Sequence, residues 1–293
     1  MKTEKEIAEL AQMACVLEVC APKPGNINRG HDFSDTSLQD FLLSAVAVGP
    51  AFENAGRLGI GEIVWQATAD THRLVRSNTN LGIVLLLAPL VKASAGLSGV
   101  NHLQDCLRAC LNALTVEDAR LVYESIRRAR PGGMGKVSEA DISEEPTITL
   151  LQAMILGQSR DSVAREYATD FAITFEIGLP ALNEALGEGA DFSNAIVQAY
   201  LTILSRVPDT LIARKKNIET ARQISRRAGE VLNQGGVFRP QGKAALARFD
   251  QELRDPWHTL NPGATADLAT AAVFLRLLET STAGPGRSEE IRG

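Results

Sequence analysis

The sequence predicts an all-α fold, a single compact domain of about ten to twelve helices. Apolar residues make up 45% of the chain and are mainly Ala and Leu, whereas aromatic residues make up only 5%. This balance favours helices over sheets. No alternating strand pattern or internal repeat is present. We expect residues 1–279 to form the single domain and residues 280–293 to be a disordered tail.

Helical periodicity of the apolar residues predicts most of the elements directly. The expected helices cover residues 4–20, 38–53, 62–76, 101–114, 116–129, 147–157, 161–186, 192–205, 241–254 and 262–279. Two prolines modify this pattern, since proline lacks the backbone donor that a helix interior needs. The apolar segment after Gly82 is expected to end near Pro89, and the helix over 161–186 to bend at Pro180.

Capping residues mark several of the expected helix starts. Thr115 precedes the helix over 116–129, and Asp209 or Thr210 begins a turn or helix after Pro208. Asn261 fits as an N-cap, with Pro262 in the first helical position.

Charge and cysteine content exclude several classes of protein. The formal net charge of -5 argues against a general nucleic-acid binder. The N-terminus lacks the apolar core of a signal peptide, and the longest apolar run, Ile83 to Val91, is too short to cross a bilayer. We therefore expect a cytoplasmic protein without a membrane partner. The four cysteines lack CxxC spacing, which favours reduced core thiols over metal ligands.

The stretch from Glu18 to Asp35, EVCAPKPGNINRGHDFSD, combines conformational restriction with dense functional groups. Its two prolines forbid regular helix, and Gly25 permits a backbone angle that other residues avoid. The stretch carries two cations, two amides, an imidazole and two carboxylates in its loop. A solvated connection and a ligand site are both compatible with this composition.

Three further polar segments interrupt the helical pattern: Arg76 to Gly82, Arg206 to Asn217, and Asn261 to Leu268. The first is either a capped turn or a polar lip that meets a ligand. The run Arg214 to Lys216 is typical of a solvated helix face. Another polar segment, Pro131 to Glu145, is long for a loop within a domain, and is expected to be a lid or a disordered loop.

Four of the polar segments, in the order in which they occur along the chain, resemble motifs of the triphosphoribosyl-dephospho-CoA synthase family. They are PKPGNINRGHDFSD at 22–35, SNTNLG at 77–82, VPDTLIAR at 207–214 and NPGATADL at 261–268. The resemblance implies an ATP-binding transferase of cofactor biosynthesis that moves the triphosphoribosyl group of ATP to dephospho-CoA and releases adenine. It also implies Mg²⁺ as the companion of ATP, and it leaves a homo-oligomer open.

The resemblance implies roles for the polar residues of these segments. The transfer needs acid and base groups and a carboxylate near an oxocarbenium-like centre, and the triphosphate needs Mg²⁺ and cations. The expected catalytic residues are His31, Asp35, Asp209 and Asp267. The expected metal ligands are Asp32, Asp35 and Asp267. The expected nucleotide and phosphate contacts are Lys23, Gly25, Asn28, Arg29, Asn78, Thr79, Asn80, Thr210, Arg214 and Gly263. The division of acid, base and metal roles among the four acids stays open.

Two alternatives accompany this hypothesis. The PGN and HDF forms of the first segment resemble a divergent branch associated with methanopterin-type one-carbon cofactor pathways. That likeness implies a related ATP-dependent transferase with another phosphorylated acceptor. The second alternative is a non-catalytic helical scaffold, for which the four segments need not lie near one another.

Overall fold

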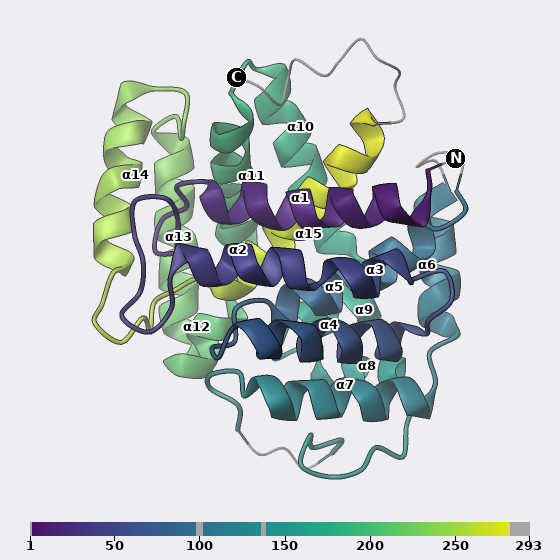
Figure 1. The fold of residues 1–293 in the computed structure, drawn as a ribbon. Helices are drawn as coiled ribbons and strands as arrows, with labels where there is room; N and C mark the ends of the chain where they lie inside the picture. The colour runs from purple at the N-terminus through teal and green to yellow at the C-terminus, as the bar shows by residue number, and fades with distance from the viewer. Residues whose placement is uncertain (1, 98–101, 136–138, 282–293) are drawn as a thin grey trace. The chain divides into compact units, whose positions relative to one another are not determined.

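The structure, a computed structural model, describes residues 2–97, 102–135 and 139–281, and within these ranges every regular element is helical (Figure 1). The all-α prediction is therefore confirmed. The helices are α1 (Glu4–Cys20), α2 (Leu38–Ala47), α3 (Gly49–Glu53), α4 (Ile60–Leu74), α5 (Leu81–Ser94), α6 (Leu103–Asn112), α7 (Val116–Ala129), α8 (Leu150–Gly157), α9 (Ser162–Ala168), the π-helical turn η2 (Thr174–Gly178), α10 (Leu179–Gly187), α11 (Phe192–Arg206), α12 (Thr210–Lys215), α13 (Ile218–Asn233), α14 (Pro240–Leu253) and α15 (Gly263–Thr280).

Internal contacts divide the chain into two units. The first unit comprises Met1–Val16 and Gln39–Phe171, and the second comprises Leu17–Leu38 and Ala172–Gly293. The expectation of a single domain over 1–279 stays a prediction. The expected disordered tail covers residues 280–293, and all of it except Thr280 and Ser281 lies outside the described residues. Among the described residues, no helix combines the length and apolar character that a membrane span requires.

The first unit is built around α5, which packs against α3, α4, α6, α7 and α9. Twelve of the fourteen residues of α5 are buried, so this helix contributes much of the apolar area that stabilises the unit. Around it, α4 and α7 run side by side (Figure 1). Thr115 caps α7 as expected, accepting a hydrogen bond from the amide of Asp118 at 3.1 Å.

The expectation that the α5 segment ends near Pro89 is wrong, since the helix continues to Ser94. Pro89 has no N–H to donate to the carbonyl of Leu85 one turn earlier. The hydroxyl of Tyr167, on α9, donates to that carbonyl instead, at 2.7 Å. The buried acceptor therefore keeps a partner, and the helix tolerates the proline.

The second unit is built around α15 and α11. Thirteen of the eighteen residues of α15 are buried, and it contacts η2, α10, α11 and α12. The helix α11 also packs on α10 and α13, and α13 in turn packs on α14 (Figure 1). The loop from Ala21 to Ser37 belongs to this unit.

Two expected helices are each divided in the structure. The helix expected over 38–53 breaks into α2 and α3, with Pro50 in the first turn of α3. The helix expected over 161–186 breaks not at Pro180 but at Asp170 and Phe171, which adopt left-handed φ angles of 51° and 63°. Pro180 lies in the first turn of α10, where its missing N–H costs little.

Candidate functional site

Three of the four motif segments meet in the second unit, at the start of α15. A Cβ atom placed on Gly25 would lie 3.2 Å from Pro262, and one on Gly263 would lie 2.7 Å from Leu211. Asp209 accepts hydrogen bonds from Thr265. The NPGATADL segment therefore touches both the loop from Ala21 to Ser37, which we call the PKPGN loop, and the VPDTLIAR segment. These two are far from each other in the sequence.

Lys23 lies in the interior rather than at the surface. Its side chain is fully buried, and its ammonium pairs with the carboxylate of Glu18 at 3.1 Å and donates to the backbone carbonyls of Glu18 and Ala21. Burial lowers the pKa of Lys23 and raises the pKa of Glu18, and the attraction between the two opposes both shifts. A contact between Lys23 and a phosphate would require this pair to separate, which is costly in the interior.

Both the backbone angle and the close neighbours at position 25 require a glycine there. Its φ angle is +73°, and a Cβ atom would lie 2.6 Å from Cβ of Leu253 at the end of α14. Only glycine accepts this angle without cost and permits so close an approach. The expected role of Gly25 as a nucleotide contact stays a prediction, while its packing role follows from these distances.

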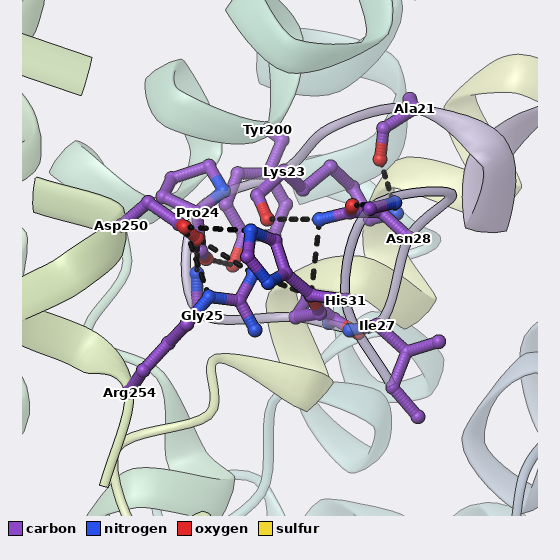
Figure 2. A network of polar contacts seen from close by, with 12 residues as sticks. Ala21, Lys23, Pro24, Gly25, Ile27, Asn28, His31, Tyr200, Asp250 and Arg254 are labelled. Carbon is purple, nitrogen blue, oxygen red and sulfur yellow. Dashed lines mark hydrogen bonds and ion pairs between the residues drawn. The ribbon is translucent and has the colours of Figure 1, made fainter. Parts of the chain in front are cut away.

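Side chains from α11, from α14 and from the residue directly after α14 hold three successive residues of the PKPGN loop (Figure 2). The hydroxyl of Tyr200 donates to the carbonyl of Pro24 at 3.0 Å, Asp250 accepts from the amide of Gly25 at 2.8 Å, and Arg254 donates to the carbonyl of Asn26 at 3.2 Å. Burial raises the pKa of Tyr200 well above 10.0, which keeps this hydroxyl protonated as a donor.

Asn28 closes the same loop on itself. Its side-chain amide donates to the carbonyl of Asn26 at 3.2 Å, and its side-chain oxygen accepts from the amide of Gly30 at 2.9 Å. Its backbone exchanges two hydrogen bonds of 3.1 Å with His31 (Figure 2). Asn28 is buried, so its side chain shapes the loop.

The outer end of the loop, which we define as Arg29 to Asp35, is largely exposed. His31 is 52% exposed, and its Nε2 lies 3.8 Å from Asp250. Asp32 accepts from the amide of Leu38 at 2.6 Å. Asp35 is exposed, with the hydroxyl of Thr36 3.4 Å away. These side chains are accessible to a ligand in a way that Lys23 is not.

A second loop, residues 254–262, packs beside this outer end. The imidazole of His258 stacks on Phe33 with ring centroids 3.9 Å apart, and its Nε2 lies 3.2 Å from the hydroxyl of Ser34. Asp255 shapes the loop by accepting from the amides of Trp257, Thr259 and Leu260. Partial burial would raise the pKa of Asp255, but these hydrogen bonds outweigh it and lower that pKa.

The cationic side chains at the end of α12 are not all exposed to solvent. Lys215 is half-buried and donates to the carbonyl of His258 at 3.0 Å. Burial lowers the pKa of Lys215, while the charges of Asp35 and Asp255 oppose that shift. Arg214 is also half-buried, and only Lys216 of the three consecutive cations is exposed.

Asp209 is enclosed by hydrogen-bond donors. One carboxylate oxygen accepts from the amides of Leu211 and Ile212 at 2.9 and 3.0 Å, and the other accepts from the amide and the hydroxyl of Thr265, both at 2.8 Å. The N-cap expected here is confirmed as Asp209. Burial raises its pKa, and the hydrogen bonds oppose that shift. Asp209 therefore joins the starts of α12 and α15.

The remaining candidates of this unit lie along α12 and α15. Thr210 begins α12, and Asp267 is half-buried on the second turn of α15. The N-cap expected at Asn261 is wrong by one position, since α15 begins at Gly263 and Pro262 occupies the cap position without a side-chain bond. Pro262 and Gly263 pack closely against neighbouring chain, which fixes where the helix can start.

The SNTNLG segment lies in the first unit, and its polar groups have partners there. Asn78 accepts from the amide of Leu81 at 3.2 Å, Asn80 donates to Thr71 at 3.1 Å, and the hydroxyls of Thr79 and Ser44 lie 2.5 Å apart. These contacts agree with the capped turn, one of the two expected alternatives. Nucleotide contacts by Asn78, Thr79 and Asn80 stay predictions.

The expected metal ligands do not form a cluster on their own. Within the described ranges, no group of three or more His, Cys, Asp or Glu side chains is arranged to hold a metal ion. Asp32 and Asp35 are nevertheless exposed carboxylates on one loop. Mg²⁺ is commonly held by one or two carboxylates together with substrate phosphates, and this donor set fits that mode.

The structure also adds residues to which the sequence pattern gave no role in the site: Glu18, Lys215, Asp250, Arg254, Asp255 and Thr265. The only local signal was the spacing of Asp250 and Arg254, which allows an ion pair along one helix face. Acid and base residues at this spacing are common on exposed helices. The spacing alone therefore does not show that this pair holds a distant loop.

The loop from Pro131 to Glu145 is described in part, because residues 136–138 lie outside the described residues. Its later half is tied to α7. Tyr123 donates to the carbonyl of Ala140 at 2.8 Å, and Arg127 donates to that of Ile142 at 2.7 Å. The alternative of a lid stays a prediction.

Comparison with known proteins places this architecture among transferases. A protein of Escherichia fergusonii named 2-(5''-triphosphoribosyl)-3'-dephosphocoenzyme-A synthase is 25% identical, over 92% of this chain and 90% of its own. A protein of Pseudomonas savastanoi pv. phaseolicola named a probable synthase of the same kind is 25% identical, over 97% of this chain and 95% of its own. A crystal structure described as that of a "putative triphosphoribosyl-dephospho-coA synthase" of Archaeoglobus fulgidus superposes with a TM-score of 0.61 and 26% identity, covering 81% of this chain and 98% of that one.

The model of the ATP:dephospho-CoA triphosphoribosyl transferase family matches residues 4–285. The match covers almost the whole chain, and the chain therefore belongs to this family. The resemblance that the four motif segments carry is confirmed, and so is the assignment as a transferase. Neither alternative, the related transferase with another acceptor or the non-catalytic scaffold, is favoured.

Proposed function

We propose that the protein transfers the triphosphoribosyl group of ATP to dephospho-CoA and releases adenine. Membership of the family carries this proposal. The meeting of three motif segments at the start of α15 supports it, because a scaffold would have no need to bring these polar segments together.

In the proposed reaction, a ribose hydroxyl of dephospho-CoA attacks the anomeric carbon of ATP. A carbon–oxygen bond forms, and the bond between that carbon and adenine breaks. Adenine leaves with the bonding electrons and takes up a proton, while the attacking hydroxyl loses one. A positioned base and acid accelerate these proton transfers, and a carboxylate stabilises the positive charge that develops on the sugar.

The exposed residues of the outer end are the best placed for these roles. We assign proton transfer to His31 and Asp35, because both are accessible and lie on a loop that is held firmly at its base. Arg29 and Arg214 are assigned to the triphosphate, as guanidinium groups suit phosphate oxygens. Asp267 stays a candidate for stabilising the sugar cation.

Asp209 and Lys23 fit anchoring roles better than chemical ones. Both are buried, and both are engaged with partners inside the protein. Mg²⁺ would enter with ATP and would be held by phosphate oxygens together with Asp32 or Asp35. There it would neutralise triphosphate charge.

The test is product analysis by mass spectrometry after incubation with ATP, Mg²⁺ and dephospho-CoA. We expect a product heavier than dephospho-CoA by one triphosphoribosyl group, and adenine in equal amount. A parallel incubation offers a reduced pterin as the acceptor. Adenine release only with the pterin would instead support the related transferase, and no adenine release with either acceptor would contradict the proposal.

A further inference from the structure

We propose that Asp250 is a positioning residue of the transfer reaction. Its carboxylate accepts a hydrogen bond from the Gly25 amide and lies 3.8 Å from the His31 imidazole, and in this proposal it sets where the outer end of the loop stands. The inference rests on the proposed function, which assigns a proton-transfer role to His31. Asp250 itself need not touch a substrate.

The first step of the argument is that the Asp250 carboxylate is held in place. Arg254, the residue directly after the end of α14, donates from Nε to Oδ2 at 2.9 Å and from Nη2 to Oδ1 at 2.8 Å. Such two-point pairing between a guanidinium and a carboxylate adds directional specificity as well as energy. Both side chains are 21% exposed, so water screens this pair less than it would at an open surface.

The second step is that this carboxylate reaches both ends of the loop (Figure 2). Its Oδ1 accepts from the amide of Gly25 at the buried base, and its Oδ2 lies 3.8 Å from Nε2 of His31 at the exposed end. His31 is joined to Asn28 by two backbone hydrogen bonds, so the segment between the two ends is short and closed.

The third step is that the other anchors do not replace Asp250. Tyr200 and Arg254 hold the carbonyls of Pro24 and Asn26, but neither contacts His31 among the described interactions. The Phe33 and His258 stack holds the loop beyond His31. Asp250 is therefore the group that links the fixed base of the loop to the imidazole. Misplacing a reacting group by about 1 Å can lower a rate roughly a hundredfold.

The test variant is Asp250→Asn, which keeps the size of the side chain but removes its charge. The matched control is Glu252→Gln on the same helix, because Glu252 pairs with Arg227 at 2.8 Å and makes no described contact with the loop. We expect Asp250→Asn to lower kcat about a hundredfold, with KM for ATP and dephospho-CoA changed less than about threefold. Glu252→Gln should keep wild-type kcat.

A second readout separates positioning from a general structural effect. Because Asp250 acts through His31, Asp250→Asn should lower kcat no further in a His31→Ala background. Arg254→Lys serves if Asp250→Asn does not fold, since lysine keeps the charge but loses the two-point pairing. We expect it to lower kcat by about tenfold, again only when His31 is present.

Hydrogen–deuterium exchange of the peptide covering residues 22–35 tests the same link without substrate. We expect faster exchange in Asp250→Asn and wild-type exchange in Glu252→Gln. Equal kcat in the two variants, or an undiminished effect in the His31→Ala background, would overturn the inference. Unchanged exchange in Asp250→Asn would also overturn it, whereas a wild-type protein that releases no adenine would instead overturn the proposed function.

Discussion

The PKPGN loop has a buried base and an exposed outer end, and the two carry similar residue types in opposite surroundings. At the base, Lys23 and Glu18 form an ion pair that is almost fully buried. At the outer end, Arg29, Asp32 and Asp35 are exposed. The charged residues of one motif therefore have two different roles. The buried ones stabilise the loop, and the exposed ones are accessible to a ligand.

Asp209 extends the comparison to a second motif segment. Its carboxylate is as deeply buried as the ion pair, and four donors from α12 and α15 surround it. This carboxylate already has hydrogen-bond partners within the protein, so it anchors the chain. The loss in free energy of unfolding on substitution should therefore separate the residues that anchor a loop from those that the loop exposes.

Lys23→Met should lower the free energy of unfolding by about 3–5 kcal/mol, because it leaves the Glu18 carboxylate buried without its cation. Urea unfolding measures this loss, and Glu18→Gln together with Lys23→Met should recover much of it. Burial raises the pKa of Glu18 above its ordinary value of 4.5. The folded state then binds the extra proton, so the stability of Lys23→Met should rise as pH falls through that raised pKa towards 4.5. Unchanged unfolding with weaker ATP binding would instead support a phosphate contact.

Asp209→Ala should lower the free energy of unfolding by about 3 kcal/mol, since it leaves the donors of Leu211, Ile212 and Thr265 without their acceptor. Chemical unfolding measures this effect. The matched comparison is Thr265→Val, which removes only the hydroxyl donor. If Asp209→Ala kept wild-type stability and lost only turnover, Asp209 would belong with the catalytic residues and not with the anchors.

Gly25→Ala should lower the free energy of unfolding by about 2 kcal/mol. The new Cβ would overlap Leu253, and the φ angle of +73° is unfavourable for alanine. A thermal unfolding series on Gly25→Ala and Gly187→Ala provides the contrast, because a Cβ on Gly187 would meet nothing within 4 Å. Similar melting temperatures for the two variants would show that the base of the loop is less constrained than its contacts indicate.

Asp267→Asn should lose about 0.3–1 kcal/mol of stability if its charge complements the start of α15. If Asp267 also stabilises the sugar cation, turnover should fall by an amount worth several kcal/mol in the barrier, roughly a thousandfold or more. Turnover and a melting curve on the same variant separate these two roles. Near-native turnover with a small drop in melting temperature would remove Asp267 from the catalytic residues.

Asp35→Asn should change the free energy of unfolding by less than about 0.5 kcal/mol, because the side chain is exposed. Turnover should nevertheless fall about a hundredfold, the usual scale for losing a proton-transfer group. The control is Asp105→Asn, an exposed acid of α6 that is outside every motif segment and pairs with Arg108. An Asp35→Asn enzyme as active as this control would contradict the assignment of Asp35.

The helical class, the places where helices give way to polar segments, and the family can all be predicted from the amino-acid sequence. These properties depend on local patterns: apolar residues at helical spacing, capping residues such as Thr115 and Asp209, and four motif segments in order. A local pattern is complete within a few residues, so it can be read without knowing what packs against it.

The tertiary structure alone decided which polar residues are anchors and which are presented. Lys23 and Arg29 are cations of one loop, yet only one is buried. Pro89 is tolerated within α5 because a hydroxyl 82 residues beyond Leu85 donates to the Leu85 carbonyl, which Pro89 cannot do, and Gly25 is held by a carboxylate 225 residues away. The physical reason is that burial and hydrogen-bond partners are supplied by residues distant in the chain, and spacing along the sequence does not encode them.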